Sequence, residues 1–204
     1  RRRSPPTTDR WGVPGSSPKT PSATVSASRN RSELRLVRAA HVHFLAVARI
    51  DVPDGPGGDS AMVWTLRPEM SGMVHKMITT AYGSSKLPAA EREVARMRIA
   101  QLNACGACAT FRARSVGDAG VTEEMYEHLD EWRTYPGYRD RQRLAIEYAE
   151  QFTVDHRAID DELFGRLRDH FADDEILDLT LCLAVYLGLG RTLEVLQITE
   201  HADV

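Results

Sequence analysis

After residue 88 the apolar residues recur at helical spacing, and no stretch of useful length alternates apolar and polar residues as a strand does. Proline, which ends helices, occurs only once after Pro88, at Pro136 in the turn YPGY. The pattern therefore predicts an all-α domain. Its expected helices cover about residues 88–102, 104–118, 122–132, 139–152, 162–171 and 174–198.

Several residues mark helix starts. Pro88 suits a first helical turn, and Thr122 is followed by two glutamates, as an N-cap often is. Asp160 and Asp173 are the next expected N-caps. Farther upstream, the stretch AMVWTLRPEMSGMVHKMITTAYG predicts one or two more helices, one of them starting at Pro68.

The first 46 residues have a different composition. Five of the ten prolines fall within the first 21 residues, among many serines and threonines, and residues 1–32 carry a net charge of +6. Such a segment has too few apolar residues to offset its ordering entropy. We therefore expect a disordered basic tail over residues 1–46 and one helical domain over residues 47–204.

Charge and cysteine content narrow the function classes. The net charge of −3 and the pI near 6.2 give no basic face for nucleic acid. The apolar stretch LVRAAHVHFLAVARI is too short to span a membrane and is interrupted by charges, so no membrane partner is expected. Three cysteines are too few for a disulfide framework, which favours a cytoplasmic protein. Cys182 lies among apolar neighbours and is interpreted as a core residue.

The stretch AQLNACGACATFR contains a C-x-x-C pair, Cys105 and Cys108. If Asn103 turns the chain, both cysteines lie in the first turn of the next helix, where free N–H groups favour a thiolate. A structural zinc site needs four ligands, and neither a second C-x-x-C nor a suitably spaced histidine pair is present, so no metal is expected. A thioredoxin-like motif would need a preceding strand. Tight packing of small residues remains an alternative.

Glu93 and Arg112 are expected at the same level of a helical hairpin that turns near Asn103. Each lies eight or nine residues from the turn, which at 1.5 Å per residue is about 12–14 Å. Glu93 would then face Arg112, one turn beyond Cys108. Taken alone, Glu93 is equally well explained as a first-turn acid that the helix dipole favours.

The segment EREVARMRIAQLNACGACATFRARSVGDAG resembles the core of the carboxymuconolactone decarboxylase and alkylhydroperoxidase D-like family. The peroxidase branch has a glutamate, a C-x-x-C twelve residues later, and a histidine four residues after the second cysteine. Glu93, Cys105 and Cys108 fit this spacing, and the resemblance extends over about residues 49–198.

The resemblance implies a helical homo-oligomer that reduces hydroperoxides without a cofactor. Cys108 would be oxidised to a sulfenic acid, Cys105 would resolve it to a disulfide, and Glu93 would join the catalytic group. A lipoyl or thioredoxin-like dithiol partner would supply the electrons. A homo-oligomer is also expected because the last helix is apolar on most faces.

Position 112 departs from the family pattern, because it is arginine where the peroxidase branch has histidine. Arginine cannot shuttle protons near neutral pH, although its charge can support a thiolate. A purely structural Arg112–Glu93 pair is the alternative. Two other functions therefore stay open: a non-redox binding or assembly module, and a decarboxylase-like enzyme.

Overall fold

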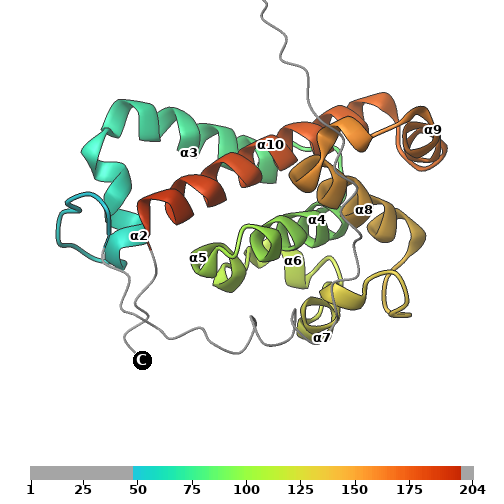
Figure 1. Ribbon diagram of the computed structural model, residues 1–204, viewed down its shortest axis with the longest axis horizontal. Coiled ribbons are helices and arrows are strands. Elements are labelled where there is room, and N and C mark those ends of the chain that lie inside the picture. Colours follow the sequence, from blue (N-terminus) through green and yellow to red (C-terminus); the bar gives the residue numbers. More distant parts are fainter. Residues whose placement is uncertain (1–47, 199–204) are drawn as a thin grey trace, which may run out of the picture. The chain divides into compact units, whose positions relative to one another are not determined.

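The computed structural model describes residues 48–198, so the predicted tail over residues 1–46 lies outside the described part. The described residues form helices and no strand, which confirms the all-α prediction (Figure 1). The α-helices are α2 (Gly58–Met62), α3 (Pro68–Gly83), α4 (Ala89–Leu102), α5 (Gly106–Thr110), α6 (Arg114–Gly117), α7 (Glu123–Glu127), α8 (Asp140–Val154), α9 (Asp161–His170) and α10 (Asp173–Leu196). Three 3-10 helices are η1 (Val63–Leu66), η2 (Leu129–Glu131) and η3 (His156–Ala158).

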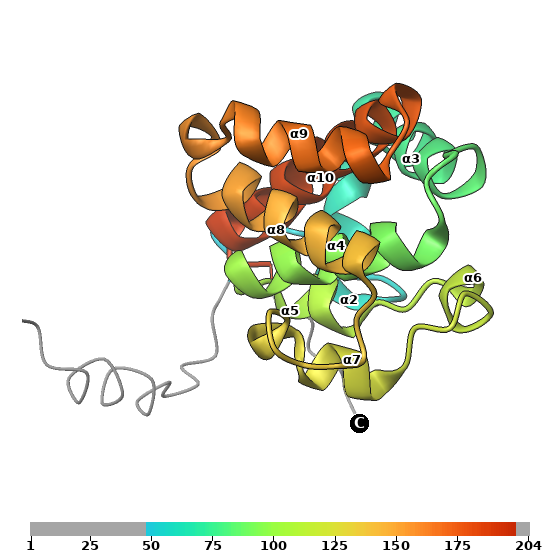
Figure 2. The same ribbon diagram turned by 90° about the vertical axis from the view of Figure 1, so that its right-hand side faces the viewer.

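Helix α4 is the central element, and it packs against α8 on one side and α10 on another (Figures 1 and 2). Ala95 and Ile99 of α4 belong to one core, which α8, α9 and α10 complete. Val94 and Met97 belong to a second core with residues of α6, α7 and α8. Burying a large aliphatic side chain contributes about 1.5–3 kcal/mol, so the two cores hold α4 firmly between them.

The helix starts follow the predicted signals with two exceptions, of which one is Pro88: it is the N-cap of α4 and not a residue of its first turn. Thr122 and Asp160 cap α7 and α9 as predicted, each accepting a backbone N–H three residues later at 3.3 and 2.9 Å. Asp173 is not a cap but the first residue of α10. Ala172 is the N-cap instead, and the Glu175 carboxylate accepts its backbone N–H at 3.0 Å, which satisfies a group that alanine cannot cap itself.

The predicted continuous helix over residues 104–118 is wrong. It divides into α5 and α6, because Phe111 and Ala113 have extended backbones with ψ of 131° and 136°. The helix predicted over residues 122–132 is likewise divided, into α7 and η2, at His128. As a result, Arg112 lies in a loop between two short helices and not one helical turn beyond Cys108.

Helix α10 is long and apolar enough to cross a bilayer by length and composition, as no other helix of residues 48–198 is. One third of its most apolar stretch is buried, against α4, α8, α9 and α3. Its residues Leu179 and Leu183 are fully buried in the first core, whereas Leu177 and Leu181 are exposed, so α10 contributes to the core on one face and leaves apolar side chains uncovered on another.

Candidate active site

The two cysteines follow a sharp turn at the end of α4. Ala104 carries the turn with a φ of 54°, whereas Asn103, expected to carry it, has a φ of −79°. The left-handed conformation costs an L-residue about 1–2 kcal/mol, so an alanine there needs support from its surroundings. Backbone bonds provide it, since the Cys105 N–H donates to the Ala100 carbonyl at 3.0 Å. Cys105 is thereby placed as the N-cap of α5.

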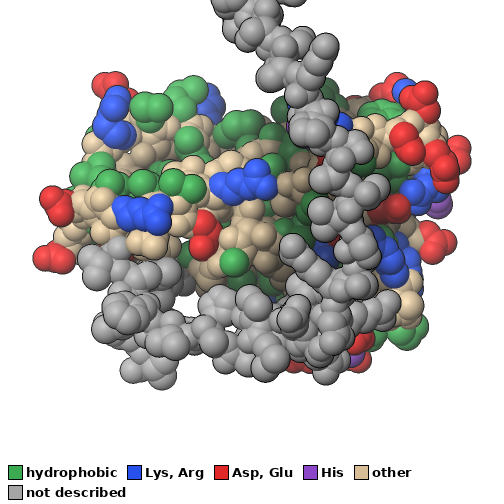
Figure 3. Space-filling model, in the orientation of Figure 1, with side chains coloured by type: hydrophobic (Ala, Val, Ile, Leu, Met, Phe, Trp, Pro, Cys, Tyr) green, Lys and Arg blue, Asp and Glu red, His purple; other side chains and the backbone are tan. Residues whose placement is uncertain are grey.

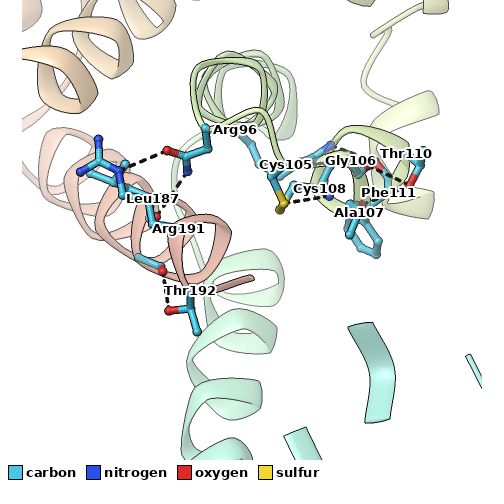
Figure 4. The surroundings of a disulfide bond; sticks show 12 residues. Arg96, Cys105, Gly106, Ala107, Cys108, Thr110, Phe111, Leu187, Arg191 and Thr192 are labelled. Atoms are coloured by element: carbon cyan, nitrogen blue, oxygen red, sulfur yellow. Dashed lines mark hydrogen bonds between the residues drawn. A yellow bond between two sulfur atoms is a disulfide. The ribbon is translucent and has the colours of Figure 1, made fainter. Parts of the chain in front are cut away.

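Cys105 and Cys108 are joined by a disulfide, with Cα atoms 5.3 Å apart. Figure 4 shows the pair at the start of α5, beside the α10 residues Leu187 and Arg191. Cys105 is only 1% exposed, whereas Cys108 is partly exposed and lines a cavity. The Cys108 backbone N–H donates to Cys105 Sγ at 3.3 Å. The two sulfurs therefore differ in access, and Cys108 is the one that a ligand can reach.

The turn is anchored to α10. Asn103 Nδ2 donates to the Leu187 carbonyl at 3.4 Å, and Arg191 Nε donates to Asn103 Oδ1 at 3.3 Å. Gly190 makes this approach possible, because a Cβ at that position would lie 2.7 Å from Asn103 Nδ2 and 3.7 Å from Cys108 Sγ. The position of the cysteine pair thus depends on the absence of a side chain at Gly190.

Gly190→Ala is expected to lower the unfolding free energy by about 1–3 kcal/mol, because the new methyl group displaces Asn103 from its hydrogen bonds. Gly188→Ala is a matched control in the same helix, since a Cβ there meets nothing within 4 Å. It should raise stability by about 0.5–1 kcal/mol through helix propensity alone. Urea denaturation measures both, and equal effects of the two variants would refute the proposed contact.

Glu93 lies inside the domain in a network of strong hydrogen bonds. Its side chain is 1% exposed and pairs with Arg96, whose Nη2 and Nε donate to the carboxylate at 2.6 and 2.8 Å. The Tyr126 hydroxyl donates to Glu93 Oε1 at 2.9 Å. Burial and the Glu93 charge raise the pKa of Tyr126, so the phenol stays protonated and acts as a donor.

Arg96 connects this carboxylate to the cysteine segment. Its Nη1 donates to the Cys108 carbonyl at 2.6 Å and its Nη2 to the Phe111 carbonyl at 2.9 Å. These carbonyls accept from arginine because α5 ends at Thr110 and leaves them without helical partners. Burial opposes the charge of Arg96, but its hydrogen bonds to the Glu93 carboxylate and the charge of that carboxylate outweigh burial and raise the Arg96 pKa.

Arg112 does not contact Glu93, so the predicted direct pair is wrong. Its Nε and Nη2 donate to the Glu123 carboxylate at 3.0 and 3.1 Å, and its guanidinium lies 4.0 Å from the centre of the Tyr126 ring. The bond to Glu123 raises the pKa of Arg112 and lowers that of Glu123. Arg112 is therefore connected to Glu93 only indirectly, through Tyr126 and through the Phe111 carbonyl that it shares with Arg96. Arg96 is the direct partner of the buried carboxylate.

A cavity of about 270 Å³ opens beside Cys108 and Arg96. Its volume lies just below the roughly 300–1,000 Å³ typical of small-molecule sites. Its walls are mostly apolar and include Trp64, Ile78, Ile99, Phe111, Leu189 and Leu193. The arrangement thus combines one accessible sulfur, one buried guanidinium and an apolar wall.

Two residues of the site were not predicted from the sequence. Arg96 could have been noticed, because it follows Glu93 at the i, i+3 spacing of a helical ion pair. Tyr126 comes from α7, 33 residues from Glu93, and nothing in the sequence indicates that they meet. Among the described residues, no group of three or more His, Cys, Asp or Glu side chains is arranged to hold a metal ion.

Comparison with known sequences gives a family match. The sequence profile of the carboxymuconolactone decarboxylase family matches residues 68–151, which include α3, α4 and both cysteines, and this confirms the resemblance. The chain is 28% identical to the uncharacterized protein YdfG of Bacillus subtilis over 93 residues. These residues are 45% of this chain and 63% of YdfG, so the chain spans less than two thirds of that relative.

Solved structures share the fold. A protein of unknown function from Agrobacterium tumefaciens, described as a candidate AhpD antioxidant defence protein, aligns with a TM-score of 0.64 and 19% identity. The alignment covers 77% of this chain and 100% of that chain. The debrominase Bmp8 aligns with a TM-score of 0.62 and 13% identity, over 71% of this chain and 78% of that chain. At these identities the likeness concerns the fold alone.

Proposed function

Because the profile of the carboxymuconolactone decarboxylase family matches residues 68–151, which include both cysteines, we propose that this chain is a thiol-dependent peroxidase whose Cys105–Cys108 dithiol reduces hydroperoxides. One observation carries the proposal. The two cysteines lie within disulfide distance, yet only Cys108 faces a cavity while Cys105 is buried behind it. In a peroxidase with a resolving cysteine, one sulfur must be accessible to the substrate, and the second must lie within disulfide distance of the first.

The proposed reaction has three steps. The Cys108 thiolate attacks the terminal oxygen of a hydroperoxide, the O–O bond breaks, and a sulfenic acid forms while the alkoxide leaves and takes a proton from water. The Cys105 thiol then attacks the sulfenic sulfur, which forms the disulfide and releases water. Finally, an external dithiol reduces the disulfide and is itself oxidised, so two electrons pass from the dithiol to the peroxide.

The cavity indicates the class of substrate. Its apolar walls offer little to hydrogen peroxide but would bury the carbon skeleton of a small organic hydroperoxide. The proposed electron donor is a lipoyl or thioredoxin-like dithiol, and no cofactor is required, since the cysteines carry the electrons. The proposed compartment is the cytoplasm, where the reduced form of the pair can be regenerated.

The proposal is tested by steady-state consumption of an organic hydroperoxide with a panel of dithiol donors, including dihydrolipoamide and a reduced thioredoxin. We expect turnover with at least one dithiol, and faster turnover with cumene hydroperoxide than with hydrogen peroxide. Absence of turnover with every donor, by a reduced and folded protein, would contradict the proposal.

Two observations favour a second candidate function. Arg112 replaces the histidine that the peroxidase branch uses, and a fold neighbour of this chain is a debrominase. The same helical framework therefore also occurs in an enzyme of another chemistry. The alternatives are a non-redox binding or assembly role and a decarboxylase-like reaction. They would be favoured by two results together: small apolar ligands bind the cavity equally well in the parent and in a Cys105→Ser/Cys108→Ser variant, and no thiol chemistry is detected.

A homo-oligomer is the proposed assembly. Met70, Met73 and Met77 of α3 are exposed, as are Leu177 and Leu181 of α10. Hydrophobic side chains gather over these two helices in the space-filling view (Figure 3). A continuous apolar surface of this kind on two adjacent helices favours association with a second copy of the chain.

Met73→Glu is expected to shift the protein toward monomer, because it places a charge in this surface. Val154→Glu is the matched control, since Val154 and Met73 are both 69% exposed but Val154 belongs to α8, which is not one of the two helices that carry the apolar surface. Light scattering at micromolar concentration measures the mass. A parent protein that is already monomeric, or a Val154→Glu variant that dissociates equally, would contradict the assignment of this surface.

A further inference from the structure

We propose that Arg96 binds the departing oxygen of the hydroperoxide and stabilises its negative charge as the O–O bond breaks. This inference rests on the proposed function and assigns a catalytic role to a residue whose sequence position did not indicate one. It also answers how peroxide reduction proceeds when position 112 is arginine and offers no relay histidine.

The hydrogen bonds of Arg96 leave one donor for a ligand. A guanidinium has five N–H groups, of which one is on Nε and two are on each terminal nitrogen. Nε donates to Glu93, Nη2 donates to Glu93 and to the Phe111 carbonyl, and Nη1 donates to the Cys108 carbonyl. Four groups are therefore occupied, and the second N–H of Nη1 has no hydrogen-bond partner among the side chains and backbone that the structure describes, a set that excludes the side chains of Arg114 and Ser115.

The location of Arg96 suits this role. Arg96 and Cys108 both line the cavity, and the nitrogen with the spare N–H is the one bonded to the Cys108 carbonyl, so it lies next to the reactive residue. The side chain is 5% exposed, which keeps its charge poorly screened by water. The two bonds to Glu93 fix the plane of the guanidinium, so the donor needs no reorganisation during the reaction.

A donor at the leaving oxygen would accelerate the reaction. When the Cys108 thiolate attacks the terminal oxygen, the negative charge moves to the other oxygen of the peroxide, which leaves as an alkoxide. Arginine stays protonated near neutral pH, so Arg96 stabilises this charge by a hydrogen bond while water supplies the proton. Arg112 is less suited, because its guanidinium pairs with the exposed Glu123 and does not line the cavity.

The test compares two reactions of Cys108 under single-turnover conditions. Alkylation by iodoacetamide needs a thiolate but expels iodide, whereas tert-butyl hydroperoxide expels a strongly basic alkoxide. Arg96→Gln should slow the hydroperoxide reaction about 10²-fold, as loss of an oxyanion donor does, while alkylation changes far less. Arg96→Lys keeps a charge without the fork geometry and should lie between the parent and Arg96→Gln.

Arg98→Gln is the matched control. Arg98 lies on the same helix and is also paired with carboxylates, those of Glu150 and Asp130, but it does not line the cavity. Its substitution should leave the ratio of the two rates unchanged. If Arg96→Gln or Arg96→Lys lowers both rates equally, Arg96 is only a structural residue and the inference is wrong.

A second test uses the parent protein alone and measures how the rate of the peroxide reaction depends on the leaving group. The dependence of the rate on leaving-group pKa, from peracetic acid to tert-butyl hydroperoxide, should be shallower for the protein than for free glutathione. An equally steep dependence overturns the role of Arg96 and leaves the proposed function standing. A parent that is alkylated at Cys108 but consumes no hydroperoxide overturns the proposed function itself, and this inference with it.

Discussion

In the absence of an electron donor, Cys108→Ser is expected to consume no hydroperoxide, whereas Cys105→Ser should consume one equivalent per subunit and then stop at the sulfenic acid. The difference follows from access, because Cys108 lines the cavity and Cys105 is 1% exposed. Without Cys105, the sulfenic acid formed at Cys108 has no thiol at disulfide distance and accumulates. Without Cys108, the buried Cys105 sulfur cannot meet the substrate.

Cys182→Ser is the control for these variants. Cys182 is free and buried, and burial raises its pKa, so its thiol is a poor nucleophile near neutral pH. The variant should consume hydroperoxide at the parent rate. Hydroperoxide loss and trapping of the sulfenic acid by dimedone measure the three outcomes. Full turnover by Cys108→Ser, or loss of turnover in Cys182→Ser, would contradict the assignment of the reactive sulfur.

Glu93→Gln is expected to lower the unfolding free energy by about 3–5 kcal/mol, because it leaves the Arg96 charge buried without its carboxylate partner. The Glu93 side chain is 1% exposed and that of Arg96 is 5% exposed, so water cannot replace the lost interaction. The tyrosine that donates to Glu93 also loses a charged acceptor.

Glu123→Gln provides the comparison, since Glu123 accepts from Nε and Nη2 of Arg112 as Glu93 does from Arg96. Its side chain is 71% exposed, so water takes over the bonds and stability should hardly change. Chemical denaturation of both variants measures the difference. Similar effects of the two substitutions would mean that the Glu93–Arg96 pair is no more than an ordinary surface ion pair.

The helical fold could be predicted because its signals are local. Pro68 begins α3 as predicted, and Thr122 and Asp160 cap their helices, since each acts on the backbone of its own first turn. The division of the helix predicted over residues 104–118 could not be predicted in this way. Its freed carbonyls are satisfied partly by Arg96 of α4, and that contact exists only after the two segments pack together.

The turn before the cysteines is a second feature that local sequence preferences did not predict correctly. Asn103 was expected to take the left-handed conformation because asparagine tolerates it better than alanine does. In the structure Ala104 takes it, while the Asn103 amide is used to bind Leu187 and Arg191 of α10. A tertiary contact 84 residues away along the chain therefore overrides a local preference.

The feature of the site that was hardest to predict from the sequence was which side chain pairs with Glu93. Helical rise alone placed Glu93 and residue 112 at a common level, but it could not tell which arginine would bind the carboxylate. Arg96 is on the same helix face as Glu93, whereas Arg112 is drawn toward Glu123 by the break after Thr110. The sequence thus proposed Cys105, Cys108 and Glu93 as candidates, whereas Arg96, its ion pair with Glu93 and the contact of Tyr126 became visible only in the folded domain.

The most direct measurement mixes the fully reduced protein with increasing amounts of tert-butyl hydroperoxide, without an electron donor, and follows peroxide loss and cysteine oxidation by mass spectrometry. We expect one Cys105–Cys108 disulfide for each hydroperoxide consumed, saturation at one per subunit, and an unmodified Cys182. A hydroperoxide that persists while both thiols remain free would contradict the central claim that this pair is a peroxide-reducing dithiol.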